Sequence, residues 1–475
     1  MQSFVLAFFD DNSYHLSMKR FIGRQKEIGI LRQSIRDGVK GIMVYGQRQV
    51  GKTSLIDEAF STDEFVLVRH ECVKGSYEYN VELLALSVAN ATGIGFAKDS
   101  RDVFNLLSIM EMSGSGKPIV VVLDEYQYLR QTQDDGVIDS YMQRFIDSIT
   151  GNVTLVLCGS YVTVMQELLE YGNPLFSRLK TIVRLTTFDY LESSLFYPDL
   201  CVRDKIAFYA VFGGYPFVLE NVDQTLSLEE NIKNLMLNPY SSLRMTIESV
   251  LLQEIGKTGM PYEVLSKIGN SKLRYHELQS LMAGDVTGTL DRILKRLVEM
   301  GIIEKVSPIN RKDDKRKTFY EIRDNLLRFH FTYIYPMRAL PARLEGDVLY
   351  DKFIAPSLNT WISKRFEVQV REYFAHMQDA SLEAVGSYWY DDPSSRKNGE
   401  FDCALKRNGR YSLYEVKYLS RPMTYQLYEE ERAKMEKVEY IDVASLGFVS
   451  SSGFDFTPPS DGEFITGEML YDLPV

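Results

Sequence analysis

The N-terminal part of the chain alternates short, continuous apolar runs with longer stretches of mixed polarity. Apolar strands are predicted at 42–45, 119–123 and 153–160, and an amphipathic helix follows the first of them. Continuous apolar runs of this length are typical of strands that are buried on both faces of a parallel sheet. The pattern therefore predicts an α/β domain with a central parallel sheet.

The middle of the chain has a helical pattern that is followed by a hairpin. Three helices are predicted from 261, 274 and 287, and the hairpin spans 302–324. In the third helix, apolar residues recur every three or four positions and form one stripe against a core: Leu290, Ile293, Leu294, Leu297 and Val298. Three helices and a hairpin predict a winged helix, in which the third helix would enter a major groove and the wing would touch phosphates.

Basic residues are grouped on the third helix and at the hairpin tip: Arg292, Lys295, Arg296, Arg311, Lys312, Lys315, Arg316 and Lys317. Acidic residues dilute this patch: Asp291, Glu299, Asp313 and Asp314. DNA contact is one interpretation. A solvated basic loop, or a module that contacts protein, is the other.

The C-terminal part predicts a helix, three strands and a second helix, which is the core of a small α/β fold. The helix covers 353–377, the strands cover 382–392, 399–407 and 410–419, and the charged helix covers 424–439.

Length and composition agree with several packed domains. At 475 residues the chain is longer than one core usually supports, and about 150 residues per domain suggests roughly three domains. Apolar residues make up 45% and charged residues 25%, which excludes a disordered chain. The four scattered cysteines predict reduced, mostly buried thiols rather than a zinc site or disulfides.

Charge and hydropathy limit the partners. The net charge of −11 argues against a chain that is coated in nucleic acid, although one local basic patch remains compatible with it. No apolar run approaches the ~20 residues of a membrane span, and the N-terminal MQSFVLAFF lacks a basic leader. We therefore expect a cytoplasmic protein without a membrane partner.

The clearest motif lies between the first strand and its helix. It matches G-x-x-x-x-G-K-[ST] in the required strand-loop-helix context. In such a loop the backbone N–H groups wrap a phosphate chain, Lys52 reaches the terminal phosphates and Thr53 ligates Mg²⁺. The predicted nucleotide-binding residues of this segment are Gly46, Gln47, Arg48, Gln49, Val50, Gly51, Lys52, Thr53 and Ser54.

Two further strand ends supply candidate catalytic groups. Asp124 and Glu125 follow the second strand, where Asp124 would hold Mg²⁺ through water and Glu125 would orient or deprotonate the attacking water. Ser160 ends the third strand at the same predicted edge of the sheet. It would bind the γ-phosphate or the water, or it is part of a strand-terminating turn.

Six stretches together resemble AAA+-related ATPases of the archaeal type, close to the signal-transducing STAND NTPases. They occur in the expected order between about residues 18 and 340: FIGRQKEI from Phe21, the loop at 46–53, VVVLDEYQYL, LCGSYVTVM, NPLFSRL and GGYPFVLE. The resemblance implies an ATPase core at 18–185, a helical lid at 186–245 and a winged helix at 246–345. Residues 1–17 are then an N-terminal extension or a mis-assigned start.

The resemblance also assigns roles that spacing alone would not give. The segment with Gly23 and Arg24 would pack beside the adenine, and Gly214 with Pro216 would lie in the lid near the nucleotide. Ser160 falls at the sensor position. Arg178 matches an arginine that senses or stabilises the γ-phosphate, in its own chain or across subunits. ATP and Mg²⁺ are the implied cofactors.

The predicted C-terminal hairpin carries Asp402 on one strand and Glu415-Val416-Lys417 on the next. In a metal-dependent phosphodiesterase, Asp402 and Glu415 would be oxygen ligands for Mg²⁺, the Val416 carbonyl would be a third, and Lys417 would hold the nucleophilic water. A charged, solvated hairpin is the alternative. The segment resembles the PD-(D/E)xK nuclease superfamily, which implies a restriction-endonuclease-like domain at 346–475 and a further acid, Glu367, from its first helix.

Two functions remain open from the sequence. The first is an ATPase that acts on DNA through the winged helix and a Mg²⁺-dependent nuclease domain. The second is a nucleotide switch in which the nuclease fold is inactive and binds DNA, a regulatory protein or a second copy of the chain.

Overall fold

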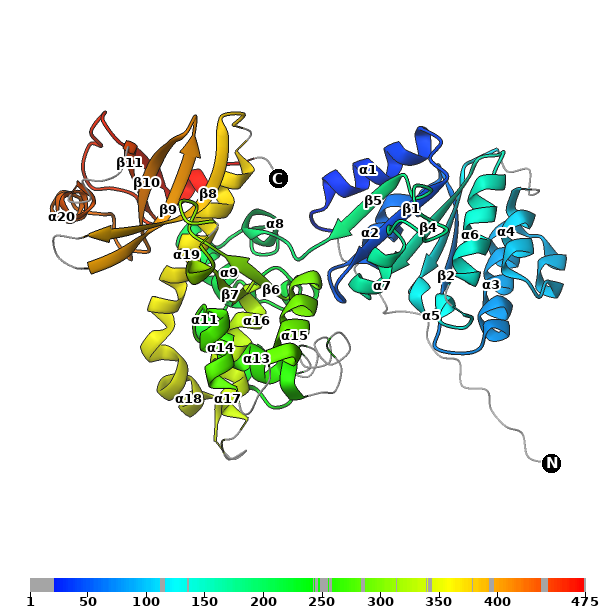
Figure 1. Cartoon of the computed structure of the whole chain (residues 1–475), viewed down its shortest axis with the longest axis horizontal. Coiled ribbons are helices and arrows are strands. Elements are labelled where there is room, and N and C mark those ends of the chain that lie inside the picture. The colour runs from blue at the N-terminus through cyan, green and yellow to red at the C-terminus, as the bar shows by residue number, and fades with distance from the viewer. Residues whose placement is uncertain are drawn as a thin grey trace, which may run out of the picture.

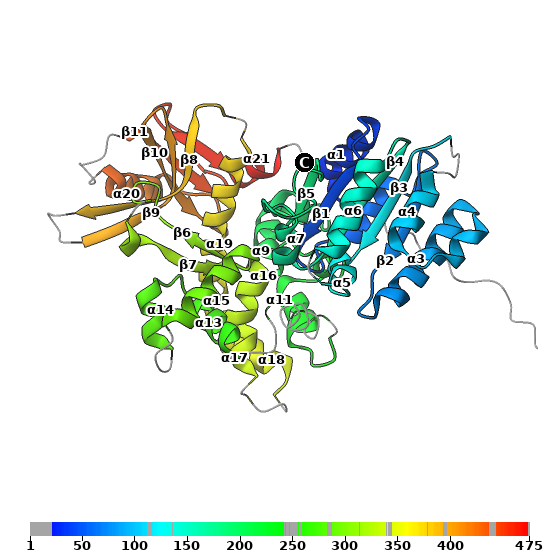
Figure 2. The same ribbon diagram turned by 45° about the vertical axis from the view of Figure 1, so that its right-hand side comes forward.

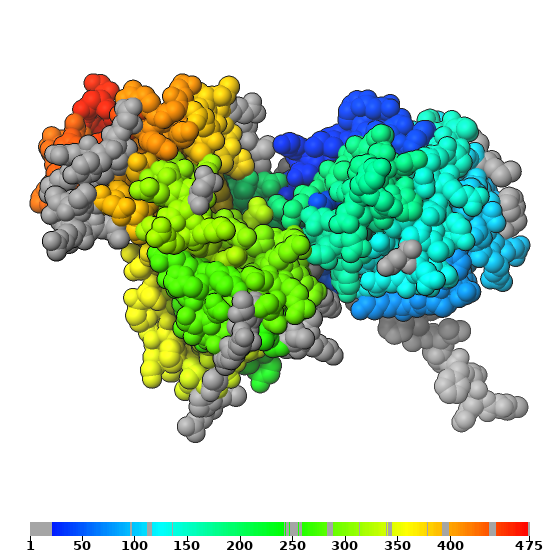
Figure 3. All heavy atoms as spheres, in the orientation of Figure 1, coloured from blue at the N-terminus to red at the C-terminus, as the bar shows by residue number. Residues whose placement is uncertain are grey.

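The computed structural model describes residues 21–111, 116–134, 136–241, 243, 247, 255, 259–282, 287–312, 314–338, 340, 344–377, 379–392, 397–436 and 443–473. The predicted extension at 1–17 and Asp313 of the hairpin tip lie outside these residues. Figure 1 shows an N-terminal lobe joined to a body that contains the middle and C-terminal parts, and Figure 3 shows the same division with all heavy atoms. Within the described ranges, no helix is both long and apolar enough to cross a membrane.

The N-terminal lobe is built on a five-stranded parallel sheet in the order β2-β3-β4-β1-β5. The strands are β1 (Gly41–Gly46), β2 (Val66–Glu71), β3 (Ile119–Asp124), β4 (Val153–Gly159) and β5 (Thr181–Leu185). Every residue of β1, β3 and β4 is buried. The predicted α/β fold with a central parallel sheet is therefore confirmed.

Helices cover both faces of this sheet (Figure 1). Alternate residues such as Val44 and Val122 face α1 (Gln25–Arg36) and α2 (Lys52–Phe60). Met43 and Leu123 face the opposite layer, as expected from the two-residue repeat of a strand. That layer and its connections contain α3 (Tyr77–Thr92), η1 (Gly95–Asp99), α4 (Val103–Glu111), α5 (Tyr126–Arg130), α6 (Val137–Ser148) and α7 (Val162–Glu167).

Short helices follow β5 and lead into the middle of the chain. They are α8 (Tyr190–Ser194), α9 (Val202–Phe212), α10 (Pro216–Leu219), α11 (Leu228–Ile232) and the π-helical turn η2 (Lys233–Leu237). Next come α13 (Gly259–Gly269), α14 (Tyr275–Leu281), α15 (Thr287–Glu299), β6 (Ile303–Val306), the 3₁₀ turn η3 (Lys315–Lys317) and β7 (Phe319–Ile322).

The predicted stripe on α15 faces the core. Leu290, Leu294 and Leu297 are buried, and Ile293 and Val298 are half-buried. Strands β6 and β7 pair antiparallel, as a hairpin does. Three helices followed by a two-stranded hairpin agree with the predicted order, and the winged-helix assignment stays a prediction.

The C-terminal part contains a mixed sheet in the order β12-β11-β10-β9-β8. It is preceded by α16 (Asn325–Phe329), η4 (His330–Ile334), α17 (Tyr335–Met337), α18 (Gly346–Leu349), η5 (Tyr350–Ile354) and the long α19 (Ala355–His376). Its own elements are β8 (Leu382–Asp392), β9 (Lys397–Arg407), β10 (Arg410–Lys417), α20 (Tyr425–Glu436), β11 (Val443–Ser450), β12 (Glu463–Thr466) and α21 (Gly467–Tyr471). The sequence pattern had predicted α19, β8, β9, β10 and α20, but neither β11 nor β12.

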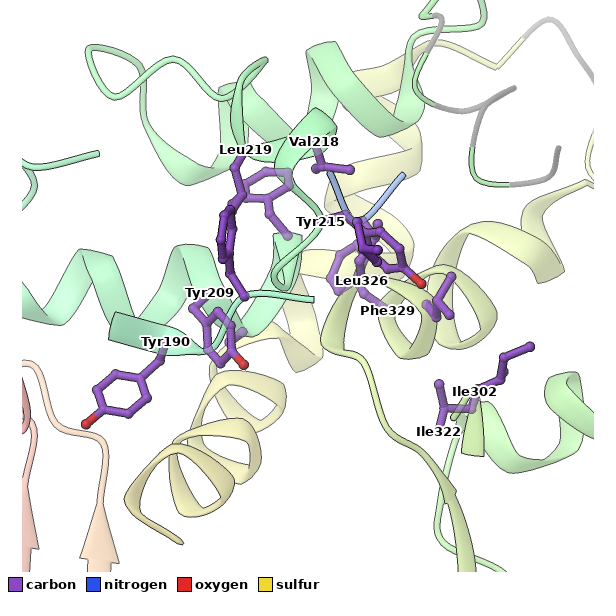
Figure 4. Close-up of a cluster of buried hydrophobic side chains, with 14 of the residues drawn as sticks. Tyr190, Tyr209, Tyr215, Val218, Leu219, Ile302, Ile322, Leu326 and Phe329 are labelled. Atoms are coloured by element: carbon purple, nitrogen blue, oxygen red, sulfur yellow. The ribbon is translucent and has the colours of Figure 1, made fainter. Parts of the chain in front are cut away.

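Helix α9 lies at the centre of the body (Figures 1 and 2). Side chains from later segments donate hydrogen bonds to its backbone. Asn325 Nδ2 donates to the Tyr209 carbonyl at 3.1 Å, and Gln369 Nε2 donates to the Ile206 carbonyl at 3.1 Å. Trp361 Nε1 donates to the Ala210 carbonyl at 2.9 Å. Figure 4 shows the aromatic and aliphatic side chains that pack around this helix, among them Tyr209 and Phe329.

The hairpin of the middle part docks on β8 of the C-terminal sheet. Ile309 N donates to the Ser387 carbonyl at 2.8 Å. Asn310 Nδ2 donates to the Trp389 carbonyl at 2.7 Å, and Trp389 N donates to Asn310 Oδ1 at 3.1 Å. The Ile309 side chain packs in the same core cluster as Phe401. The hairpin and the C-terminal sheet therefore form one packed unit.

Half-buried acidic groups lie where α8 and α9 meet α19. Asp189, at the start of α8, accepts a hydrogen bond from Glu192 N at 2.8 Å and pairs with His376 Nε2 at 2.9 Å. On α19, burial and the nearby Asp189 carboxylate raise the pKa of Glu372 to about 7, while His376 and the Tyr209 hydroxyl act in the opposite direction. Tyr209 donates to Glu372 Oε2 at 3.4 Å.

Replacing Glu372 by Gln is expected to stabilise the protein at alkaline pH. The folded-state pKa of about 7 exceeds the value of about 4.3 in an unfolded chain. The folded state therefore holds more protons in this window, and Glu372 costs stability as the pH rises through 7. Glu372→Gln should increase the free energy of unfolding at pH 8 by more than about 1 kcal/mol, with a smaller gain at pH 5.

Denaturant unfolding at both pH values checks this prediction. Glu82 is an exposed residue on α3 and provides the matched control, since Glu82→Gln should change neither value. An equal gain from Glu372→Gln at pH 5 and pH 8 would contradict it.

Candidate functional site

The loop between β1 and α2 has the backbone shape of a phosphate-binding loop. Gln49 and Gly51 adopt positive φ angles of 66° and 88°. A Cβ atom at Gly46 would lie 2.1 Å from the Leu185 carbonyl oxygen, so only glycine fits there. Lys52 Nζ donates to the carbonyls of Gly46 at 3.0 Å and Gln47 at 2.8 Å. The lysine cation is thus held inside the loop.

Thr53 and Asp124 meet at the carboxyl edge of the sheet. Thr53 Oγ1 donates to Asp124 Oδ2 at 2.8 Å, and Asp124 is buried at the end of β3. A hydroxyl and a carboxylate are oxygen ligands of the kind that Mg²⁺ prefers. The donor set fits the ion that the sequence predicts here.

Glu125 and Ser160 are also brought together. Ser160 Oγ donates to Glu125 Oε2 at 2.7 Å, and Ser160 is fully buried at the end of β4. Gln127 Nε2 donates to the same Glu125 carboxylate and to Ser160 Oγ. Sequence reasoning missed Gln127, although its position two residues after Glu125 was the available signal.

Two adjoining cavities lie over the loop. The smaller, of about 400 Å³, is lined by Lys52, Thr53 and Glu125 among others, and is polar. The larger, of about 810 Å³, has an apolar end formed by Phe21, Ile22, Phe188 and Phe196. Both are lined by Gly51, Ser54, Pro216 and Glu220, so they adjoin along that wall. An apolar pocket beside a polar one suits a base and its phosphates.

Arg24 forms part of the wall of the larger cavity. Its guanidinium lies 4.2 Å from the centre of the Phe188 ring, donates to the Thr186 carbonyl and pairs with Glu192 at 3.7 Å. Gly23 precedes it with a φ angle of 75° and lines an adjacent cavity of about 1220 Å³. Val50 is buried and lines the larger nucleotide cavity.

The segment after α9 closes the site from the other side. A Cβ atom at Gly214 would lie 1.9 Å from the Phe188 carbonyl oxygen, and Pro216 lines both nucleotide cavities. Between them, the Tyr215 hydroxyl donates to Gln47 Oε1 at 2.7 Å. Gln47 Nε2 donates in turn to the Met300 carbonyl, just beyond α15, at 2.8 Å. The phosphate loop therefore contacts both the segment after α9 and the middle part, which the sequence did not reveal.

Arg178 lies apart from this site. It precedes β5, and its carbonyl lies against Gly41, the first residue of β1. The phosphate loop leaves β1 at the opposite, carboxyl end. The Arg178 guanidinium pairs with Asp147 at 3.4 Å. Arg178 therefore lies at the other end of the sheet from the loop that would bind the phosphates of a nucleotide in the same chain. The alternative role across subunits stays a prediction.

The C-terminal residues singled out by sequence converge on one face. The register of β9 and β10 pairs Tyr414 with Cys403, and one further step sets Glu415 opposite Asp402. Val416 N approaches Asp402 Oδ2 at 3.5 Å. Lys417 Nζ donates to Glu415 Oε1 at 2.6 Å. Asp402 and Glu415 therefore do not splay to opposite faces of the sheet.

The Asp402 carboxyl group is close enough to Glu367 and Glu415 for their charges to raise its pKa. Burial and the neighbouring carboxylates of Glu367 and Glu415 raise the pKa of Asp402 to about 8. Burial also raises the pKa of Glu367, against the opposing effect of Arg371. Arg371 Nη1 donates to the Asp402 carbonyl at 2.6 Å. Such crowding is relieved by protonation or by a cation.

Glu431 is a further acid that sequence reasoning missed. It lies on α20, is buried, and its carboxylate is 3.5 Å from Lys417 Nζ. Across the described part of the chain, no three His, Cys, Asp or Glu side chains form a ready cluster for a metal. Two carboxylates and the Val416 carbonyl still fit Mg²⁺, which commonly uses one or two carboxylates and keeps several waters.

The basic residues of the hairpin divide into two groups. Lys317 lies 3.4 Å from the centre of the Trp389 ring, and Arg311 pairs with Asp391 at 3.6 Å. Lys312, Lys315 and Arg316 are exposed. The sequence had treated these five as one patch, but docking on β8 engages two of them within the chain.

Two family models match the chain. Residues 21–222 match one described as an ATPase domain predominantly from Archaea, and residues 330–435 match one described as archaeal and bacterial proteins of unknown function. The match over 21–222 and the geometry of the loop support an ATP-binding ATPase fold for the N-terminal lobe.

Individual relatives resemble most of the chain. An uncharacterized protein of Methanocaldococcus jannaschii is 24% identical over 412 residues, covering 84% of this chain and 87% of the relative. The Walker-type ATPase of Pyrococcus abyssi is 16% identical with a TM-score of 0.49, covering 66% of this chain and 96% of that one. The ORC2 protein of Aeropyrum pernix, solved in ADPNP-ADP complexes, is 13% identical with a TM-score of 0.45, covering 72% and 95%.

Proposed function

We propose that this protein is a Mg²⁺-dependent ATPase whose nucleotide cycle controls a C-terminal site that cleaves DNA phosphodiesters. The observation that carries the ATPase part is the contact of Thr53 with Asp124 at 2.8 Å, beside the pair formed by Ser160 and Glu125. These groups come from three separate segments and meet at one edge of the sheet.

ATP hydrolysis assigns each of these groups a role. Thr53 and Asp124 would hold Mg²⁺, which when bound neutralises charge on the β- and γ-phosphate oxygens. Lys52 would exchange its bonds to the loop carbonyls for the terminal phosphates. Glu125 would accept the proton of the attacking water, and Ser160 would position that carboxylate.

The C-terminal site supports the second part of the proposal. Asp402, Glu415 and the Val416 carbonyl would hold Mg²⁺, and Lys417 would position the attacking water. A PD-(D/E)xK-like fold needs this arrangement of an acid on one strand and Glu-x-Lys on the next. The raised pKa of Asp402 supports it further, because crowded carboxylates are costly without a cation.

A nucleotide switch is the second candidate, and two observations favour it. Gln47 of the phosphate loop donates a hydrogen bond to the Met300 carbonyl at 2.8 Å. A change in the loop on nucleotide binding would therefore alter a direct contact with the middle part. Arg311 and Lys317 are engaged by β8, which reduces the basic surface of the proposed wing. In this case the exposed surface of the proposed wing would bind a regulatory protein or a second copy of the chain.

Lys52→Ala is expected to abolish ATP binding, because the loop loses the cation that faces the terminal phosphates. Glu125→Gln should bind ATP with near wild-type affinity and lose turnover, because only the proton acceptor is removed. Equilibrium binding of ATP and phosphate release measure the two effects. Unchanged phosphate release in both variants would refute the assigned site.

Asp402→Ala is expected to abolish DNA degradation and to leave ATP turnover intact. Purified protein is incubated with linear, circular and single-stranded DNA, with Mg²⁺ or Mn²⁺, with and without ATP. Asp455→Ala, at an exposed position of the same domain, is the matched control. Degradation that survives Asp402→Ala would leave the fold without the activity, and the switch would be the better account.

Any DNA affinity is expected to depend on Lys312, Lys315 and Arg316. Their joint replacement by Ala should weaken binding and lower the log-log salt slope by about three, one for each lost phosphate contact. Lys317→Ala serves as the comparison, because Trp389 already engages that side chain. A wild-type protein without salt-sensitive DNA binding at low ionic strength would identify the hairpin as a protein-contact module.

A further inference from the structure

A second cation lines the phosphate cavity besides Lys52. Among the residues around the 400 Å³ cavity, Arg48 and Lys52 are the positively charged ones. Arg48 Nη2 donates to the Tyr128 hydroxyl at 2.7 Å, and its guanidinium lies 5.8 Å from the centre of the Tyr161 ring. Tyr128 and Tyr161 contact each other edge to face at 5.9 Å. Two aromatic side chains therefore hold Arg48 at the rim of the cavity.

The two tyrosines come from the segments that carry the catalytic groups. Tyr128 lies on α5, which begins directly after Glu125, and Tyr161 directly follows Ser160. Glu125 itself lines the same cavity as Arg48. The guanidinium is thus held beside the place where the γ-phosphate and the attacking water would lie.

Transfer of the γ-phosphoryl group spreads negative charge over its equatorial oxygens, and an arginine stabilises that charge in many P-loop enzymes. Arg178 lies at the opposite edge of the sheet, paired with Asp147. Tyr128 is a weak competitor for Arg48, because burial raises the pKa of its hydroxyl to about 12 and it stays neutral. A phosphate offers the guanidinium charge-assisted, two-point hydrogen bonds, which are stronger than a bond to a neutral phenol.

We propose that Arg48 is a catalytic residue that stabilises the γ-phosphoryl group from within the same chain, and that Tyr128 and Tyr161 position it. The inference rests on the proposed ATP hydrolysis. Water oxygen bonds to the γ-phosphorus while the bond to the β,γ-bridging oxygen breaks, and ADP leaves with that electron pair. Glu125 takes the water proton.

Arg48→Ala is expected to lower kcat for ATP at least a hundredfold while the Kd for ADP changes less than threefold, because the effect lies on the γ-phosphate. Arg48→Lys should recover little, since an ammonium lacks the planar fork. Added guanidinium should partly restore turnover in Arg48→Ala and not in Glu125→Gln. Arg36→Ala, on the exposed end of α1, is the matched control and should keep wild-type kcat.

Thermal unfolding with ADP verifies that each variant is folded and occupied. A kcat for Arg48→Ala within threefold of the wild type, or a loss of ADP affinity as large as the loss of kcat, would overturn the inference. Loss of turnover in Arg178→Ala but not in Arg48→Ala would assign the role to Arg178 across subunits. Absence of ATP turnover in the wild-type protein would instead overturn the proposed function together with this inference.

Discussion

The arrangement of this molecule depends on the hydrogen bonds that later segments of the chain donate to the backbone of helix α9. Residues 206–212 of α9 are all buried, and three carbonyls of this helix accept hydrogen bonds from side chains of α16 and α19. Each such bond contributes about 0.5–1.5 kcal/mol, and buried partners left unpaired would cost more. Because the donors come from more than 100 residues further along the chain, α9 joins the segment after β5 to α16 and α19.

The end of α9 is separated by only a few residues from a contact with the phosphate loop. Helix α9 ends at Phe212, and the chain continues through Gly213 and Gly214 to Tyr215, which binds the phosphate loop through Gln47. Gly213 has a φ of 60°, and Asp324 lies so close to it that a Cβ atom would be 2.9 Å from the carboxylate. The segment after α9 is therefore packed closely against the start of α16.

The sequence was a good guide wherever the signal is local. The strand-loop-helix motif placed Lys52 and Thr53, and the apolar runs placed the strand that ends in Asp124 and the strand that Ser160 directly follows. The acid and Glu-x-Lys on neighbouring strands also placed Asp402 beside Glu415, because the alternation of a hairpin is itself local. Contacts between distant segments were not accessible in this way.

Arg178 and the hairpin illustrate what a single sequence cannot supply. The position of Arg178 follows from the order of β5 beside β1, which brings the segment before β5 to the amino edge of the sheet. Nothing in the spacing of NPLFSRL encodes that edge. Similarly, the loss of Lys317 and Arg311 from the basic patch depends on Trp389 and Asp391, about 70 to 80 residues away. The role of Gln47 in joining lid and middle part is long-range as well.

The docking of the hairpin also bears on how the chain avoids self-association. Strand β8 is an edge strand of the C-terminal sheet. The unpaired backbone groups of an edge strand can form hydrogen bonds with a strand of another chain unless they are covered. Here Ile309 and Asn310 form hydrogen bonds with the backbone of Ser387 and Trp389, and the Ile309 side chain packs in the core of the C-terminal sheet. A C-terminal fragment that begins at α19 would contain all the strands of this sheet but would lack Ile309 and Asn310. It would therefore expose the backbone of β8 and the apolar side chains that Ile309 covers. Insolubility of such a fragment would reflect the missing cover rather than a failure of the C-terminal sheet to form.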